Sequence, residues 1–147
     1  MAHSRRVDSD HRYAVAIPET TPGGQAVTVQ RGKRGTAHVM HAESPDQSEL
    51  YFEVTTYRTR TQHSELVTTQ QQFLRGNAPD AELTKTATTT VGARDATTFD
   101  FKGTLQERLK ARRFLFVDGA RHTYRIVYDY TSPLNETVLQ SLEIDPS

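Results

Sequence analysis

The stretch RRFLFVDGARHTYRIVYDYTSP, residues 112–133, decides the fold. Two runs of alternating apolar and polar residues flank Asp118-Gly119, a dipeptide that favours the turn of a β-hairpin. Ser132-Pro133 then begins a helix, because proline is well tolerated at the first helical position. The stretch therefore predicts a hairpin that is followed directly by a C-terminal helix.

The segment just before this hairpin carries two conflicting signals. Residues 104–113 (TLQERLKARR) have helical propensity, and Thr104 with Glu107 forms a capping-box pattern. We nevertheless expect a strand over residues 107–117. Pairing with the strand over residues 120–130 outweighs a propensity difference of about a few tenths of a kcal/mol per residue.

A different hydrophobic period marks a helix further upstream. Leu66, Val67, Phe73 and Leu74 fall on one stripe of a 3.6-residue repeat, which predicts a helix over residues 64–75. We expect this helix to pack against the sheet through Leu66, Phe73 and Leu74.

Strand patterns account for most of the remaining chain. Alternating apolar and polar residues predict strands over residues 13–17, 27–29, 36–41, 50–55, 83–91 and 97–101. Residues 31–35 (RGKRG) are bounded by glycine and predict a loop, and the polar residues 1–11 predict a flexible N-terminal tail. The result is an α+β chain with a strongly twisted antiparallel sheet, in which residues 12–145 form a single domain.

Several of these segments together resemble a known fold family. They are RYAVAIPE (12–19), ELYFEVTTYR (49–58), SELVTTQQQFL (64–74) and the hairpin stretch. In this order they resemble the PsbP/Mog-type fold, which includes the photosystem II extrinsic protein PsbP, the Ran-binding Mog proteins and bacterial relatives of unassigned role. The resemblance implies an α/β/α sandwich, with helices on both sides of the central antiparallel sheet. It implies no particular activity, because the family is largely non-enzymatic and its members bind different partners.

Composition excludes some classes of protein. The 147 residues have a formal net charge of zero, so nothing global indicates a nucleic-acid or membrane partner. There is no cysteine, which excludes disulfides and thiol catalysis. No apolar stretch approaches the roughly 20 residues that span a bilayer. Residues 1–12 lack the apolar core of a signal peptide, which indicates a cytoplasmic protein as written, or an exported one if a signal segment has been trimmed.

No catalytic, cofactor or metal site is predicted. The six histidines form no HExxH pattern, and His38 and His41 project from opposite faces of one predicted strand. The serines lack a nucleophile elbow, and no glycine-rich loop precedes a helix. The paired carboxylates are of a kind common on exposed strand faces.

The predicted hairpin offers a candidate partner-binding surface. A two-residue turn at Asp118-Gly119 would place Arg112 directly opposite Arg125, a destabilising pair unless an anion lies between them. One face of the hairpin would carry Arg108, Lys110, Arg112, Phe114, Phe116, Arg121 and Arg125. Alternatively, Asp129, Asp100 or a helix carboxylate neutralises this face, or its guanidiniums diverge into water.

The sequence thus favours a non-enzymatic binding or accessory protein that docks an acidic protein or another anionic partner on the basic hairpin face. One alternative is a small-ligand carrier or enzyme that uses a pocket between the sheet and a helix. A second is a weak nucleic-acid binder acting through Arg31, Lys33 and Arg34, although the neutral net charge argues against it.

Overall fold

The computed structural model describes residues 4–146, and for residues 4–9 it describes the backbone alone. Its helices are α1 (His63–Asn77), α2 (Pro133–Gln140) and the short 3-10 helix η1 (Pro45–Gln47). Its strands are β1 (Ser4–Ser9), β2 (Tyr13–Pro18), β3 (Thr28–Arg34), β4 (Ala37–Glu43), β5 (Tyr51–Thr56), β6 (Glu82–Leu83), β7 (Ala87–Val91), β8 (Arg94–Leu105), β9 (Arg108–Asp118), β10 (Thr123–Tyr128) and β11 (Glu143–Ile144).

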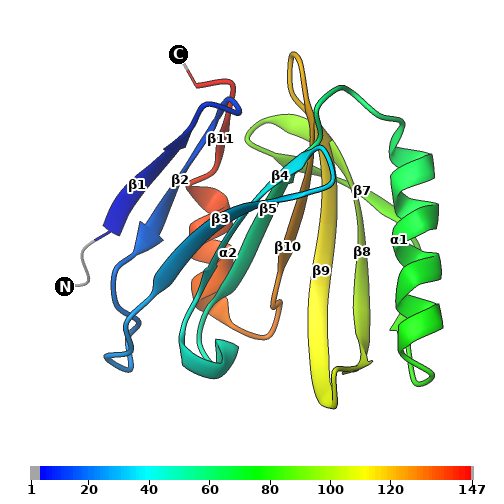
Figure 1. Cartoon of the computed structure of the whole chain (residues 1–147), viewed down its shortest axis with the longest axis horizontal. Coiled ribbons are helices and arrows are strands. Elements are labelled where there is room, and N and C mark those ends of the chain that lie inside the picture. The colour runs from blue at the N-terminus through cyan, green and yellow to red at the C-terminus, as the bar shows by residue number, and fades with distance from the viewer. Residues whose placement is uncertain (1–3, 147) are drawn as a thin grey trace.

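The strands form one large and one small antiparallel sheet (Figure 1). The large sheet has the order β3-β4-β5-β10-β9-β8-β6, and β7 also pairs with β8. The small sheet has the order β1-β2-β11. The strand over residues 107–117 is confirmed as β9, because β8 pairs with it along almost its whole length and tertiary pairing overrides its helical propensity.

The two helices lie on opposite faces of the large sheet. On one face, α1 buries Val67 and Leu74 against aromatic rings of β8 and β9, among them Phe99 and Phe116. On the other face, α2 and the small sheet cover a second core, in which Val138 of α2 takes part. The predicted α/β/α sandwich is therefore confirmed.

The register of the β9–β10 hairpin differs from the prediction. Asp118 pairs with Thr123, so that four residues, and not two, connect the strands. The Asp118 carboxylate accepts a hydrogen bond from the Thr123 hydroxyl at 2.6 Å, and the Gly119 amide donates to the His122 carbonyl at 2.8 Å, which closes this wider turn. Arg125 lies opposite Phe116, and the predicted Arg112–Arg125 pair is wrong. A shift of four residues preserves which side chains share a face, because the side-chain period of a strand is two.

Two segments expected to be irregular are strands. Instead of a tail, the described residues of the segment 1–11 include β1, which pairs with β2 from Ser4 to Ser9; residues 1–3 lie outside the described residues. Residues 31–34, expected in a loop, extend β3 along β4. In both cases the strand forms by backbone pairing with a neighbour, which polar side chains do not reveal in a sequence pattern.

The helix over residues 64–75 is confirmed as α1, but one of its predicted core residues is wrong. Leu74 is buried and Leu66 packs at the edge of the core, whereas Phe73 is 57% exposed. A neighbouring residue lies about 100° around a helix, so Phe73 points away from the strip that contacts β8 and β9. It faces the part of the sheet that α1 leaves uncovered.

Candidate functional site

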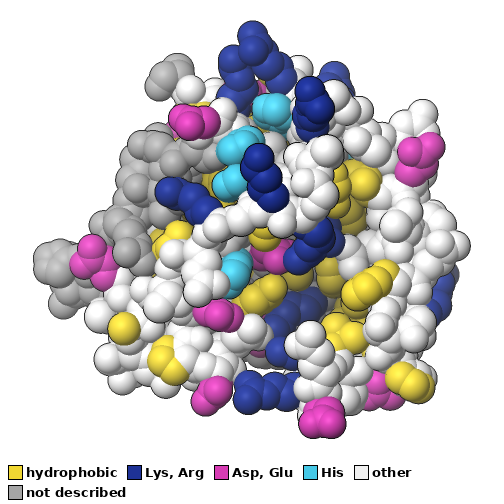
Figure 2. Space-filling model, in the orientation of Figure 1, with side chains coloured by type: hydrophobic (Ala, Val, Ile, Leu, Met, Phe, Trp, Pro, Cys, Tyr) yellow, Lys and Arg dark blue, Asp and Glu magenta, His cyan; other side chains and the backbone are white. Residues whose placement is uncertain are grey.

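A groove lies between α1 and the part of the large sheet that α1 does not cover. Its volume is about 710 Å³, and its lining comes mainly from α1 and from strands β3, β5, β8, β9 and β10. Figure 2 shows basic and hydrophobic side chains side by side in the middle of this face. The groove exists because α1 packs on β8 and β9 at one side of the sheet and leaves its other half open (Figure 1).

The strand register arranges the floor of the groove in rows. Each row crosses β9, β10 and β5 in turn, and Asp129, directly after β10, continues the register. The rows are Arg112, Asp129 and Tyr51; then Phe114, Val127 and Glu53; then Phe116, Arg125 and Thr55. In the third row Phe116 is buried beneath α1, and Arg125 lines the groove. Neighbouring rows are separated by two residues, or about 6.7 Å along the strands.

Arg125 is the central cation of the floor. It is 8% exposed, and its Nη2 donates to Glu53 Oε2 at 2.9 Å and to Thr55 Oγ1 at 3.3 Å. Its Nη1 donates to Gln70 Oε1 of α1, which ties the helix to the floor. The Arg125 Nε–H is buried and has no hydrogen-bond partner. An unmet buried donor costs about 1–3 kcal/mol, so this N–H lowers the stability of the folded chain.

Glu53 shares its charge between two arginines. It is 6% exposed, and its second carboxylate oxygen lies 3.8 Å from Nη2 of Arg34 on β3. The cluster of Arg34, Glu53 and Arg125 therefore sets two positive charges against one negative charge.

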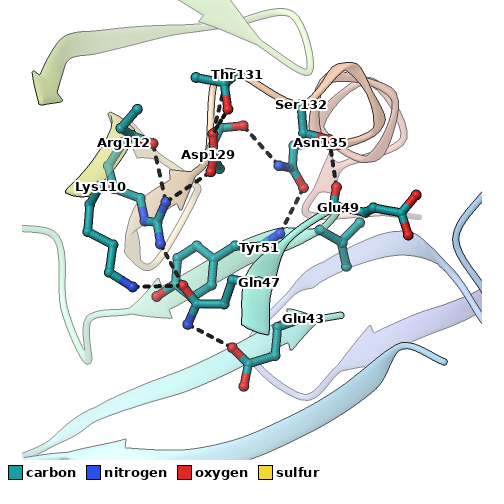
Figure 3. A network of polar contacts seen from close by, with 12 residues as sticks. Glu43, Gln47, Glu49, Tyr51, Lys110, Arg112, Asp129, Thr131, Ser132 and Asn135 are labelled. Atoms are coloured by element: carbon teal, nitrogen blue, oxygen red, sulfur yellow. Dashed lines mark hydrogen bonds and ion pairs between the residues drawn. The ribbon is translucent and has the colours of Figure 1, made fainter. Parts of the chain in front are cut away.

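Arg112 forms a second cationic centre two rows away (Figure 3). It is 7% exposed, and its guanidinium lies 4.2 Å above the centre of the Tyr51 ring. Its Nη1 lies 3.3 Å from Asp129 Oδ2, and its Nη2 donates to Gln47 Oε1 at 2.7 Å. Lys110 donates to the same Gln47 oxygen at 3.1 Å. Here too the basic residues outnumber their acidic partner.

The protonation equilibria of this second centre reflect burial first. Burial lowers the pKa of Arg112, although a guanidinium stays cationic at neutral pH. Burial, helped by the nearby Glu53 carboxylate, raises the pKa of Tyr51 to about 12. Burial and then the charges of Arg112 and Arg108 lower the pKa of Lys110. Nearby carboxylates oppose these effects: Asp129 raises the pKa of both cations, and Glu43 also raises that of Lys110.

An apolar wall faces these cations. It consists of Leu66 and Phe73 of α1 and Leu105 of β8, and it continues on the floor with Phe114 and Val127. Phe73 is one of two large hydrophobic side chains that are exposed among the described residues. The groove therefore presents an aromatic ring and two buried guanidiniums to the same volume.

The structure separates the predicted partner-binding residues into groups. Arg112 and Arg125 line the groove floor, and Lys110 lies at its edge. Arg108, which lies 3.6 Å from Asp46, and Arg121 are at opposite ends of the hairpin, about 33 Å apart along β9.

Two of the predicted surface residues are buried instead. Phe114 and Phe116 are 4% and 0% exposed, so the prediction of an exposed aromatic pair is wrong. Both rings lie in the core beneath α1, because the helix packs on the very face that the hairpin pattern suggested to be open.

Sequence reasoning missed Glu53, Tyr51 and Gln70 as site residues, and it considered Arg34 only for a nucleic-acid partner. For Tyr51 and Glu53, one signal was present in residues 49–58. Leu50, Phe52 and Val54 alternate with polar residues, and a polar face on a central strand indicates an uncovered surface of the sheet.

Within residues 10–146, whose side chains the structure describes, no group of three or more histidine, aspartate or glutamate side chains is placed to hold a metal ion. None of the helices described is long and apolar enough to cross a membrane.

Comparison with known proteins identifies the fold. No protein-family model matches the sequence, and no curated protein matches it. The structure is similar to the solution structure of the cyanobacterial PsbP protein CyanoP from Synechocystis sp. PCC 6803, with a TM-score of 0.64 and 12% identity over 98% of this chain and 94% of that one. It also aligns with PA94, a protein of unknown function from Pseudomonas aeruginosa, at a TM-score of 0.49 and 12% identity over 99% of both chains, a likeness too distant to carry an argument. At this identity the likeness to CyanoP shows the fold alone.

Proposed function

We propose that this chain, which has a PsbP-like fold, is a non-enzymatic binding protein that docks an anionic protein partner in the groove beside α1. The observation that carries the proposal is the placement of Arg112 and Arg125. Both side chains are about nine-tenths buried, and both line an open groove.

Such arginines are prepared for an anion. Much of their desolvation has already occurred in the folded chain, so an incoming carboxylate gains strong charge-assisted hydrogen bonds at a smaller further cost. Their side chains are also held in place, Arg125 by Glu53 and Gln70, and Arg112 by Gln47 and Tyr51. Little rotamer entropy is then lost on binding.

The partial neutralisation of the arginines restricts the kind of anion that the groove would bind. Glu53 and Asp129 each offset one positive charge, so the hairpin does not present a broad basic surface. Arg34 and Lys110 add one positive charge each beside these two pairs, while Glu65 of the groove lining and Glu43 near Lys110 carry negative charge. This pattern supports recognition of particular carboxylates rather than general attraction of polyanions.

Phe73 supports a protein as the partner. An exposed aromatic ring next to arginines is the composition that the centres of protein interfaces favour. A second candidate, a carrier of a small apolar anion, is favoured by the groove volume of about 710 Å³, which falls in the range of small-molecule sites.

The test is site-specific photocrosslinking in the cells that produce the protein. A benzophenone amino acid replaces Phe73 in one variant and Arg121 in a control variant, which places it on an exposed loop outside the groove. We expect position 73 alone to give a protein adduct, and Arg112→Gln with Arg125→Gln to remove that adduct while the circular dichroism spectrum stays unchanged. An adduct that survives the double substitution, or equal adducts at both positions, would refute the proposal. A small-molecule adduct at position 73 would support the second candidate instead.

A further inference from the structure

The spacing of the two cationic centres restricts what can occupy the groove, if the proposed function holds. We infer that the partner inserts an extended segment with two carboxylates four residues apart and an apolar side chain midway between them. The groove would thus recognise the order acidic–x–apolar–x–acidic.

The distance between the centres sets the separation of the carboxylates. Arg112 lies in the first row of the floor and Arg125 in the third, which is four residues further along the paired strands. Four residues of extended chain span about 13 Å, so residues i and i+4 of a partner strand match the two rows. Side chains at i, i+2 and i+4 also project from one face of such a strand, as the three rows require.

The middle row of the floor determines whether the central residue of the partner segment is apolar or charged. It carries Phe114 and Val127, both nearly buried, together with the Glu53 carboxylate. A carboxylate at the middle position of the partner would approach Glu53 and repel it, whereas an apolar side chain would pack on Val127 and on Phe73 at the wall. A third acidic residue at this position therefore weakens binding although it adds negative charge.

The shape of the groove favours an extended segment over a helix. The groove is bounded by α1 on one side and by Arg34 of β3 on the other. A single extended strand is narrower than a helix, whose diameter with side chains is about 10–12 Å.

Three acetylated and amidated heptapeptides test the inference by isothermal titration calorimetry with the full chain. They are Thr-Glu-Thr-Phe-Thr-Glu-Thr, the reordered Thr-Glu-Phe-Thr-Glu-Thr-Thr, and Thr-Glu-Thr-Glu-Thr-Glu-Thr. We expect the first to bind at least about fivefold more tightly than either of the others. Arg112→Gln or Arg125→Gln should abolish this preference, and Arg121→Gln should leave it intact.

The outcomes separate the inference from the proposed function. If all three peptides bind equally and both groove variants weaken them, the recognition order is refuted and the anion-docking groove stands. If the triply acidic peptide binds best, general electrostatics govern binding and the inference is also refuted. If none of the peptides binds, the inference fails, and the photocrosslinking result decides the proposed function independently. Chemical-shift mapping on the wild-type chain covers the case in which a variant misfolds: shifts confined to residues outside the groove would refute both ideas.

Discussion

The two faces of the large sheet are built on the same strands but differ in how they are closed. The face toward α2 is sealed by that helix and by the small sheet, and its core contains the fully buried rings of Tyr13 and Tyr124. On the opposite face, α1 packs over β8, β9 and part of β10, where Gln70 of α1 contacts Arg125, and the rest of the face lines the groove. Burial therefore serves apolar packing on one face, whereas on the other it also encloses charged side chains such as the Arg125–Glu53 pair.

The largest effect we expect distinguishes the covered half of the α1 face from the open half. Phe116→Ala removes a fully buried ring and should lower the free energy of unfolding by about 3–5 kcal/mol. Phe73→Ala, on the exposed rim, should lower it by less than about 1 kcal/mol. Urea denaturation followed by circular dichroism measures both, and equal losses would show that Phe73 belongs to the core.

Phe73 and Phe116 also show how much of the fold can be predicted from the sequence. Hydrophobic periodicity predicted the helix α1, the strand β9 and both layers of helices, because each pattern repeats over many residues. It did not distinguish Leu74 from its neighbour Phe73, since the contact strip of one helix on a sheet is narrower than its apolar stripe.

The register of the hairpin could not be predicted for a different reason. It depends on how the Asp118 side chain closes the turn with Thr123, and a turn dipeptide does not specify this. The error of four residues did not change the face assignment, so Arg112 and Arg125 were correctly placed on one face. Asp129, expected as a residue that could neutralise this face, does pair with Arg112, whereas Glu53 was not foreseen as the partner of Arg125. Contacts between strands distant in sequence, such as Glu53 with Arg125, leave no local pattern.

The second prediction tests whether the buried charges serve stability. Replacing the pair with apolar residues of similar size, Glu53→Leu with Arg125→Met, should leave the free energy of unfolding unchanged or raise it by about 1–4 kcal/mol, because a buried ion pair rarely repays its desolvation. The same double variant should lose the preference among the three heptapeptides. A fall in stability of more than about 2 kcal/mol would indicate a structural role for the pair.

The third prediction concerns the turn that ends the covered half of the α1 face. Gln106 and Glu107 connect β8 to β9 with φ angles of 51° and 68°, a left-handed conformation that costs roughly 1–2 kcal/mol per residue outside glycine and asparagine. Gln106→Asn with Glu107→Gly supplies the residues that this two-residue turn favours and should raise the free energy of unfolding by about 1 kcal/mol. The reverse order, Gln106→Gly with Glu107→Asn, is a matched control for composition. A loss of stability in both variants would indicate that the native side chains make contacts that matter more than backbone strain.

The smallest effect belongs to the closed face, where three histidines meet at the edge of the small sheet. The rings of His11 and His38 are stacked with their centroids 4.0 Å apart, and the His122 ring lies 6.4 Å from that of His11. Burial, and then the proximity of His11 and Arg31, lowers the pKa of His38 below its ordinary value of 6.5. Burial and His122 lower the pKa of His11 as well, although Asp10 opposes this effect.

A lowered histidine pKa makes the folded chain sensitive to acid. The unfolded chain binds a proton near pH 6.5, and the folded chain binds it at lower pH, so protonation favours the unfolded state. The stability that these rings contribute is therefore complete above about pH 6.5 and is lost as the pH falls below it. In His38→Gln, the urea midpoint should fall less between pH 7.5 and pH 5 than it does in the wild type. His41→Gln is the matched control for loss of one histidine, because His41 lies on the groove face of the same strand. If the urea midpoint falls by the same amount in the wild type and in His38→Gln, the stacked rings do not make the stability of the small sheet depend on pH.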